Sequence, residues 1–390
     1  MFITVIIYFI CVFLIWWSYA GYFFYLFIYY LLRRGTQFKF KASRYPDLTI
    51  IVPVYEEEKL IVNKIKNLKS LNYPGKLEFL LVDGGSQDGT LDKINNQIKN
   101  LANYQLINSS KGKIHQINTA LLKARGEIII CTDVDALLPR KALQRLVAPF
   151  TVNRKIGVVG AYVMPKNSFP VEKEYWQEHN QIRLIESRVH SASIVIAPCY
   201  AFRKSLLKCF PTDCVADDIY LSFYAHSQNY LVKYLPDVLV YETRAPRHLL
   251  EFFTHKFRKA NAYITELLRF IYTVNRFNHR SKIIYLSRFL QVIILPLVLL
   301  LFVAISLNLF IISAPYQLAV ILTYAFLFFS VLLAAIIVNL KVFSLKAPIG
   351  KSKLLNLKIF LYTNFVLFFA IFTHFFYNQD SSYEKLNSTQ

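Results

Sequence analysis

Residues 127–135 read Glu-Ile-Ile-Ile-Cys-Thr-Asp-Val-Asp, a short apolar run that ends in two carboxylates two positions apart. We expect this run to form a strand of an open α/β sheet, in which ligands bind at the carboxyl ends of the strands. Mg²⁺ and Mn²⁺ are held by one or two carboxylates together with the phosphate oxygens of a nucleotide. Asp133 and Asp135 are therefore candidate metal ligands, and the alternative is a strand that ends in a solvated Asp turn.

Strand and helix patterns alternate on the N-terminal side of this run. Apolar segments at 48–52 and 77–82, each followed by turn residues, predict two further strands. The spacing of apolar residues predicts helices at 57–70, 90–101 and 113–124. Strands that alternate with helices of this length favour a mostly parallel α/β sheet.

Acidic residues follow each of these predicted strands. They are Glu56, Glu57 and Glu58 after the first, Asp83 after the second, and Asp133 and Asp135 after the strand quoted above. The carboxyl ends of parallel strands lie along one edge of a sheet, so these side chains should converge. Because a cluster of acids repels itself, we expect a bound metal or a cationic partner there.

The composition indicates that the chain enters a membrane. Of its 390 residues, 55% are hydrophobic, with 33 Phe and 26 Tyr, and the mean hydropathy is +0.35. A helix needs about 20 apolar residues to cross a bilayer. Segments of that kind lie at 2–32, 289–312, 318–340 and 359–376. The first lacks the basic start and the cleavage site of a signal peptide, so we expect it to be an anchor.

Basic residues orient these segments. They are Arg33, Arg34, Lys39 and Lys41 after the first segment, and Lys341, Lys346, Lys351, Lys353 and Lys358 between the third and the fourth. Since loops rich in Lys and Arg stay cytoplasmic, we expect an integral, multi-pass membrane protein with a cytosolic middle part. Its expected parts are an N-terminal anchor (1–32), a cytosolic α/β domain (33–246), amphipathic interfacial helices (247–282), a transmembrane region of about three spans (283–378) and a polar tail (379–390).

The net charge of +21 raises the question of nucleic acid as a partner. Many of the basic residues, however, lie beside the membrane segments and within 244–282, where anionic lipid headgroups account for them more simply. We therefore expect membrane lipids, and no nucleic acid, as partners. The five cysteines show no paired metal-ligand spacing, and a cytosolic domain is not expected to carry a disulfide framework.

Four motifs, in order, resemble those of the processive and lipid-linked family 2 glycosyltransferases. They are Pro53-Val54-Tyr55-Glu56-Glu57, which is similar to the family's Pro-x-Tyr-Asn-Glu opening; Val82 to Thr90, similar to its nucleotide loop; Lys111-Gly112-Lys113 to Glu127, leading into the metal motif Asp133-Val134-Asp135; and Asp217-Asp218-Ile219-Tyr220-Leu221, similar to its Glu-Asp-x-x-Leu acceptor motif. The resemblance covers about residues 47–258. It implies a GT-A fold, a Rossmann-like α/β domain that binds nucleotide-sugars.

The resemblance also implies a role for each matched residue. Tyr55 and Glu57 would line the base and ribose pocket, Asp83 would contact the base, and Lys113 would lie near the nucleotide. Asp133 and Asp135 would hold Mg²⁺ or Mn²⁺ on the donor diphosphate. Asp218, beside Asp217 in the catalytic motif, would be the general base. Structural alternatives stay open at this point. They are core packing for Tyr55, a solvated helix start for Lys113, and helix capping for Asp217 and Asp218.

The sequence departs from the family pattern in three places. Glu56 stands where the family has Asn, and Gly84 stands where it has a second Asp. Where polymerising members carry Gln-x-x-Arg-Trp, residues 255–259 read His-Lys-Phe-Arg-Lys and keep only Arg258. Arg258 would bind the donor diphosphate or belong to a basic face. The missing Trp, which would stack on an acceptor sugar, argues against polymer synthesis.

The segment 249–271 has an amphipathic pattern. Its apolar stripe holds Leu249, Phe253, Phe257, Ala260, Ile264, Leu267 and Ile271, and the opposite face holds Glu251, His255, Arg258, Lys259 and Arg269. This pattern predicts a helix that lies on the membrane surface. Such a helix would place the active site at headgroup level, within reach of a lipid or lipid-linked acceptor.

The sequence therefore favours a metal-dependent, inverting transfer of a sugar from a UDP-sugar or GDP-sugar donor to a membrane-proximal lipid or glycan acceptor. Processive polysaccharide synthesis by the same family is the alternative. A nucleotidyltransferase would need a Gly-rich, basic phosphate loop near its start, which residues 53–58 do not provide. A scaffold or transporter would leave the aligned acids unexplained, and the apolar segments carry almost none of the charge that transport pathways use.

Overall fold

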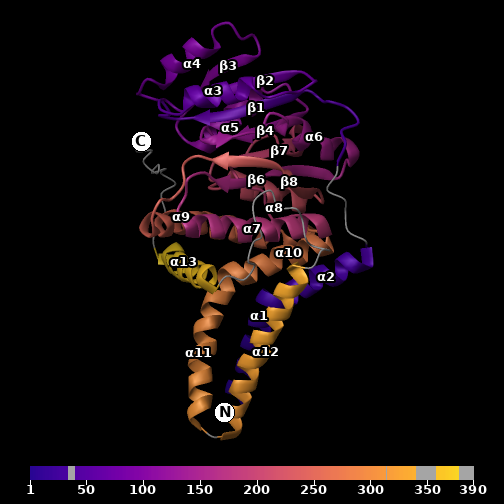
Figure 1. The fold of residues 1–390 in the computed structure, drawn as a ribbon, viewed down its shortest axis with the longest axis vertical. Coiled ribbons are helices and arrows are strands. Elements are labelled where there is room, and N and C mark those ends of the chain that lie inside the picture. The colour runs from indigo at the N-terminus through magenta and orange to yellow at the C-terminus, as the bar shows by residue number, and fades with distance from the viewer. Residues whose placement is uncertain (34–39, 313, 340–356, 377–390) are drawn as a thin grey trace.

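The computed structural model describes residues 1–33, 40–312, 314–339 and 357–376. An α/β domain stands on a bundle of apolar helices, with the N-terminus at the far end of the bundle (Figure 1). The predicted fold class, an α/β domain with flanking apolar helices, is confirmed.

One mixed sheet forms the centre of the upper domain. Its strands are β1 (Leu48–Val54), β2 (Leu77–Asp83), β3 (Tyr104–Asn108), β4 (Ile128–Thr132), β5 (Ala136–Leu137), β6 (Ile156–Pro165), β7 (Cys199–Arg203) and β8 (Leu231–Glu242), in the spatial order β3-β2-β1-β4-β7-β6-β8-β5. The strands from β3 to β4 are parallel, as predicted. The rest of the sheet is mixed, because β7 runs antiparallel to both β4 and β6.

The predicted strands lie close to where the sequence placed them, because their apolar runs are buried on both faces of the sheet. The helices that follow them are α3 (Ile61–Lys69), α4 (Thr90–Ile98), α5 (Lys113–Lys123), α6 (Ala142–Val152), α7 (Pro170–Val189) and α8 (Asp217–Ser227). The helix expected from residue 57 begins only at Ile61, since Glu56 takes a positive φ of 48° and turns the chain at the end of β1. At Gly126 a Cβ would lie 2.3 Å from the Thr49 backbone nitrogen, so only glycine fits beside β1.

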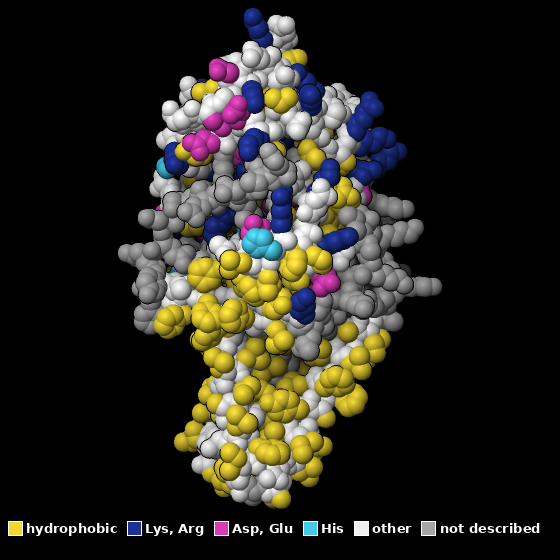
Figure 2. All heavy atoms as spheres, turned by 60° about the vertical axis from the view of Figure 1, so that its left-hand side comes forward, with side chains coloured by type: hydrophobic (Ala, Val, Ile, Leu, Met, Phe, Trp, Pro, Cys, Tyr) yellow, Lys and Arg dark blue, Asp and Glu magenta, His cyan; other side chains and the backbone are white. Residues whose placement is uncertain are grey.

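Helices form the lower part of the molecule. They are α1 (Phe2–Trp16) and α2 (Tyr22–Arg33), joined by a π-helical turn; α9 (Leu249–Ile271); α10 (His279–Phe289), which continues through a π-helical turn into α11 (Leu295–Ile312); α12 (Ala314–Asn339); and α13 (Leu357–Phe376). Among the described residues, three stretches are long and apolar enough to cross a membrane: Phe2–Leu32, His279–Ile312 and Ala314–Ile337. Large apolar side chains cover this part of the surface, while Lys, Arg, Asp and Glu gather above it (Figure 2).

The fourth predicted span corresponds to α13. Its apolar part, Lys358–His374, is shorter than the other three, and α13 packs against α9 through Tyr362 and Phe365, whose rings lie 5.2 and 5.6 Å from that of Phe253. That α13 crosses the membrane stays a prediction. The tail at 379–390 and most of the basic residues that oriented the chain lie outside the described residues, and Arg33, Lys41 and Lys358 lie within them.

The predicted polar face of α9 is partly wrong. His255 was expected to be exposed but is buried, and so is its neighbour Lys256. The Lys256 Nζ lies 2.8 Å from a carboxylate oxygen of the fully buried Glu172 on α7, which also accepts a hydrogen bond from the Trp176 indole. This buried ion pair holds the basic side of α9 against α7, while its Phe253 side meets α13. The helix is therefore enclosed by protein on both sides over this stretch.

Candidate functional site

The predicted convergence of acidic side chains occurs at the edge of the sheet where β1, β2 and β4 end. Val54 pairs with Asp83 at the ends of β1 and β2, and β4 runs parallel to β1 and leads directly into Asp133. The α8 helix brings Asp217 and Asp218 to the same place from a distant part of the chain. We call this edge, with the loops that leave it, the carboxyl edge.

Lys113 links the two acidic motifs. It is the first residue of α5, after Gly112 at a φ of 119°, and its Nζ lies 2.9 Å from Asp133 Oδ1 and 3.3 Å from Asp217 Oδ1. Only 14% of the Lys113 side chain is exposed, so the solvated helix start does not describe it. One ammonium group thus joins the predicted metal motif to the predicted catalytic motif.

Asp217 and Asp218 lie in the first turn of α8. The Tyr200 hydroxyl donates to Asp217 at 2.5 Å, and the Ala197 backbone N–H donates to Asp218 at 2.8 Å. The N-cap position belongs to Ala216, and no side chain caps this helix. The two carboxylates are therefore held by the loop and strand that pack on α8, rather than serving as its cap.

The pKa of Asp218 is raised from its ordinary value to about 7. Burial is the main cause and the nearby Asp217 carboxylate adds to it, while the ammonium groups of Lys113 and Lys259 act in the opposite direction. A carboxylate with a pKa near the working pH is suited to take a proton as a general base.

Arg244 supplies a second cation, and the sequence analysis missed it. Its guanidinium lies 2.9 Å from Asp135 Oδ2 and 2.8 Å from Glu57 Oε1, and both acids are buried. Burial lowers the pKa of Arg244, but the two carboxylates more than offset this and hold it above its usual value. The signal was present, because converging buried acids require a cation, and Arg244 lies two residues after the end of β8.

Replacing Arg244 by Met tests this arrangement. The change leaves Glu57 and Asp135 buried without their cation, so we expect the free energy of unfolding to fall by about 3 kcal/mol. The matched control is Arg44→Met, which breaks an ion pair with Glu127 whose side chains are 59% and 42% exposed. That control should cost less than about 1 kcal/mol. Chemical denaturation of the purified variants measures both, and equal losses would contradict the role of Arg244.

Asp83 organises the predicted nucleotide loop. Its Oδ2 accepts hydrogen bonds from the backbone N–H groups of Gly85 and Ser86 at 2.8 and 3.0 Å, and its Oδ1 accepts from the Ser86 hydroxyl at 2.5 Å. The Gln116 amide of α5 donates to the carbonyl oxygens of Val54 and Val82, at 2.6 and 2.7 Å. The loop is thus fixed by its own side chains and by α5, and contact of Asp83 with the base stays a prediction.

Tyr55 is only partly buried, which does not fit simple core packing. The Lys111 Nζ lies 4.7 Å from the centre of its ring, a cation–π contact at the start of the loop that leaves β1. The ring and the ammonium group together form a wall beside the carboxyl edge. This placement is compatible with the predicted contact to a nucleotide base, which stays a prediction.

The predicted metal ligands have oxygen donors of the right kind. Among the described residues, no group of three or more His, Cys, Asp or Glu side chains has metal-binding geometry. Mg²⁺ and Mn²⁺ need only one or two carboxylates when the substrate phosphates complete the shell. The Asp133 side chain is 28% exposed beside Asp135, so the pair fits such a metal.

Arg258 and Lys259 occupy different sides of α9. Arg258 is exposed, whereas Lys259 is partly buried, with its Nζ 5.1 Å from the centre of the Trp176 ring. The Lys259 charge also lowers the pKa of Asp218. Lys259 therefore faces the carboxyl edge, and the predicted contact of Arg258 with the donor stays a prediction.

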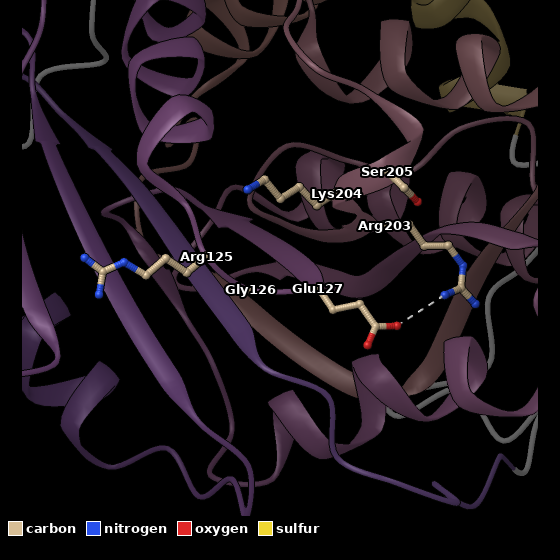
Figure 3. Close-up of a pocket in the computed structure, with 6 residues that line it drawn as sticks. All are labelled: Arg125, Gly126, Glu127, Arg203, Lys204 and Ser205. Carbon is tan, nitrogen blue, oxygen red and sulfur yellow. Dashed lines mark ion pairs between the residues drawn. The ribbon is translucent and has the colours of Figure 1, made fainter.

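A shallow hollow of about 450 Å³ lies at the opposite end of β4 and is lined by Arg125, Gly126, Glu127, Arg203, Lys204 and Ser205 (Figure 3). The Arg203 guanidinium donates to the carbonyl oxygens of Phe150 and Ile156, at 2.7 and 2.9 Å, and Lys204 donates to that of Ala124. These cations are occupied in tying loops together. The hollow is remote from the converging acids, so we do not regard it as the catalytic site.

Comparison with known proteins agrees with this geometry. The family model for glycosyl transferase family 2 matches residues 49–210, which include the carboxyl edge up to β7. Two similar proteins are poly-beta-1,6-N-acetyl-D-glucosamine synthases, one from Staphylococcus epidermidis with 24% identity over 216 residues and one from Staphylococcus aureus with 22% over 227. The matches cover 53% and 54% of this chain, and the chain spans about half the length of each relative, 52% and 54%.

A solved structure shares the fold over nearly the whole chain. It is the mannosyltransferase PcManGT from Pyrobaculum calidifontis, in complex with GDP-Man and Mn²⁺, with a TM-score of 0.69 and 22% sequence identity. The likeness covers 96% of this chain and 99% of that one, so it includes the apolar helices as well as the sheet. Residues 49–210 therefore match glycosyl transferase family 2, and they lie within an α/β domain of the GT-A fold.

Proposed function

We propose that this protein transfers a sugar from a nucleotide-sugar donor to a lipid or lipid-linked acceptor at the membrane surface. The observation that carries the proposal is the position of Lys113 between Asp133 and Asp217. This single side chain brings the candidate metal-binding motif and the candidate base within one site. A donor diphosphate at Asp133 would then lie next to an acceptor hydroxyl at Asp218.

The donor would occupy the loops that leave β1, β2 and β4. Tyr55, Glu57 and Asp83 would face the nucleoside, and Lys113 would contact the diphosphate. Asp133 and Asp135 would hold Mg²⁺ or Mn²⁺, which neutralises the charge that develops on the leaving nucleoside diphosphate. The donor is a UDP-sugar or a GDP-sugar, and the complex of the similar mannosyltransferase with GDP-Man and Mn²⁺ supports this class.

The transfer would be a single displacement. Asp218 takes the proton of the acceptor hydroxyl, whose oxygen attacks the anomeric carbon as the bond from that carbon to the diphosphate oxygen breaks. The product is the glycosylated acceptor with an inverted anomeric centre, together with the nucleoside diphosphate. Lys113 stays near the diphosphate, where its charge favours departure.

The catalytic domain would face the cytosol in a multi-pass protein. Arg276, Arg280, Lys282 and Arg288 belong to α10 and the turn before it, and α10 lies where the helical bundle meets the domain (Figure 1). The described parts of α1, α11 and α12 carry no Lys, Arg, Asp or Glu. The positive-inside rule therefore supports a cytosolic domain.

A donor panel tests the proposed function. The full chain in lipid nanodiscs is offered UDP-sugars and GDP-sugars with Mn²⁺, and release of nucleoside diphosphate is measured with and without a lipid extract. We expect release from one donor class, dependent on metal and stimulated by the lipid extract. Absence of donor binding and of release across the panel would contradict the proposal.

The pH profile of kcat/KM should fall on its acidic side as Asp218 becomes protonated. Because the base must be ionised and its pKa is about 7, we expect kcat/KM to fall about tenfold per pH unit below that value. Lys259→Gln removes a charge that lowers this pKa, so the limb should move to higher pH. Lys173→Gln, at an exposed site on α7, should leave it in place. An unchanged limb in Lys259→Gln would exclude Asp218 as the group that titrates.

The product should carry one or a few sugars rather than a long polymer. This prediction rests on Lys259, which stands near Asp218 in place of the Trp that would stack on an acceptor sugar in polymerising members. The named synthase relatives favour the alternative, processive synthesis. Size analysis of radiolabelled product from reconstituted vesicles separates the two. High-mass, hydrolase-sensitive polymer accumulating inside the vesicles would contradict single transfer.

A further inference from the structure

A cavity of about 160 Å³ lies where the α/β domain meets the apolar helices. Its walls include residues of α7, α9, α13 and the π-helical turns after α1 and α10, which are far apart in the sequence. The volume of this cavity is small compared with that of pockets for drug-sized ligands, which is about 300–1,000 Å³. It is suited to a single small headgroup.

The polar atoms that are buried at this cavity without a hydrogen-bond partner include Thr363 Oγ1, Asn364 Oδ1 and Arg288 Nε. The amide nitrogen of Asn364 donates a hydrogen bond to the Tyr19 hydroxyl at 3.1 Å. The amide oxygen of Asn364 therefore points in a different direction from this bond. Buried polar atoms are nearly always paired, and each exception needs an explanation. A hydroxyl group, an amide oxygen and a guanidinium N–H around one cavity indicate a ligand that both donates and accepts hydrogen bonds.

The cavity lies beside the candidate base. Its lining includes Ser193 and Ile194, from the loop whose Ala197 backbone N–H donates to Asp218. It also includes Tyr263 of α9, and the Asp218 carboxylate contributes to raising the pKa of the Tyr263 phenol. The cavity therefore adjoins the loop that holds the Asp218 carboxylate.

The charges around the cavity balance. Arg288 forms an ion pair with the buried Glu186, and the remaining charged side chains of the lining are one cation, Arg183, and one anion, Glu178. An anionic headgroup would meet the Glu178 carboxylate. Uncharged hydroxyl groups fit both the balance of charge and the mixture of donors and acceptors.

Apolar side chains complete the walls on the membrane side. Phe23, Leu295 and Leu367 line the cavity and belong to α2, α11 and α13. Since α2 and α11 are parts of two candidate membrane spans, this side leads toward the acyl region of a bilayer. A ligand here would combine a polar head with an apolar tail.

We propose that this cavity binds the uncharged, hydroxyl-bearing headgroup of the lipid acceptor. That the bound lipid is the acceptor rests on the proposed function. Thr363 and Asn364 accept hydrogen bonds from headgroup hydroxyls, and Arg288 donates one. The acyl chains leave beside α11 and α13, and the reacting hydroxyl points toward the Ser193–Ala197 loop and Asp218.

Lipid binding to the full chain in phosphatidylcholine nanodiscs tests the proposal. The probes are a diacylglycerol and a phosphatidic acid with the same acyl chains, at equal mole fractions, and the readout is the midpoint of thermal unfolding. Thr363→Val removes one unpaired hydroxyl without changing shape, so it should fold at least as stably as the parent. Thr373→Val is the matched control, because its hydroxyl bonds to carbonyl oxygens of α13 away from the cavity.

We expect diacylglycerol to raise the unfolding midpoint of the parent and of Thr373→Val. The affinity of Thr363→Val for diacylglycerol should be about tenfold lower than that of the parent, which is the factor expected from the loss of one good hydrogen bond. Phosphatidic acid should have no such effect. The proposal would be overturned if diacylglycerol raised the unfolding midpoint of Thr363→Val as much as that of the parent. It would also be overturned if phosphatidic acid raised the midpoint of the parent more than diacylglycerol does, or if neither lipid raised it. Asn364→Leu provides a second variant with the same expectation.

Donor binding, measured on the same samples with UDP-sugars, GDP-sugars and Mn²⁺, separates this inference from the proposed function. If a donor binds while diacylglycerol gives no shift, the proposed function stands and the cavity assignment falls. If no donor binds, the proposed function falls, and the lipid measurements still decide whether the cavity holds an uncharged headgroup.

Discussion

Asp218→Asn is expected to lose about 10³-fold in kcat while its affinity for the donor stays unchanged. An amide cannot take the proton of the acceptor hydroxyl, yet Asn keeps the size of Asp and can still accept from the Ala197 backbone N–H. Single-turnover transfer and equilibrium binding of the nucleoside diphosphate, measured separately, check the two halves of this prediction. A collapse of donor affinity would mean that Asp218 is a donor ligand or a structural group.

The stability of this variant provides an internal control. Because folding raises the pKa of Asp218 to about 7, the ionised carboxylate is less favourable in the folded state, and its contribution to stability falls as pH rises between its unfolded pKa and about 7. Asp218→Asn should therefore unfold at the same or a higher temperature above pH 7. Asp213→Asn, with a side chain that is 72% exposed, is the matched control and should keep normal transfer.

Asp135→Asn should abolish turnover and leave the protein folded in the membrane. The change weakens the metal site at the carboxyl edge, while Arg244 keeps its ion pair with Glu57 at 2.8 Å. Titration of Mn²⁺ against donor binding and turnover measures the loss. Asp92→Asn, at an exposed site on α4, should behave like the parent. Near-normal activity of Asp135→Asn in the presence of a chelator would exclude a metal role.

The parallel half of the sheet and the convergence of its acids could be predicted from the sequence. Their signals are local, because apolar runs such as 128–132 must be strands buried on both faces, and parallel strands end at one edge. The link between Asp133 and Asp217 could not be predicted in this way. It depends on the packing of α8 against the sheet, which brings together residues far apart in the chain.

The sequence pattern of α9 alone does not predict what packs against each of its faces. Its amphipathic pattern was correctly detected, but the pattern does not say whether lipid or protein covers a face. His255 and Lys256 are buried because Glu172 on α7 offers a buried carboxylate, which no local signal near residue 255 reveals. Arg244 escaped notice for a related reason, since its partners Glu57 and Asp135 come from two other strand ends.

The most direct test of the central claim follows the fate of both halves of the donor. The parent protein in nanodiscs with a lipid extract receives a donor labelled in its sugar, and label in the lipid fraction is compared with the nucleotide released. We expect one nucleoside diphosphate for each sugar recovered in lipid, with both lost in Asp218→Asn. Release of nucleoside monophosphate with transfer of a sugar phosphate, or of nucleoside diphosphate without labelled lipid, would contradict the account.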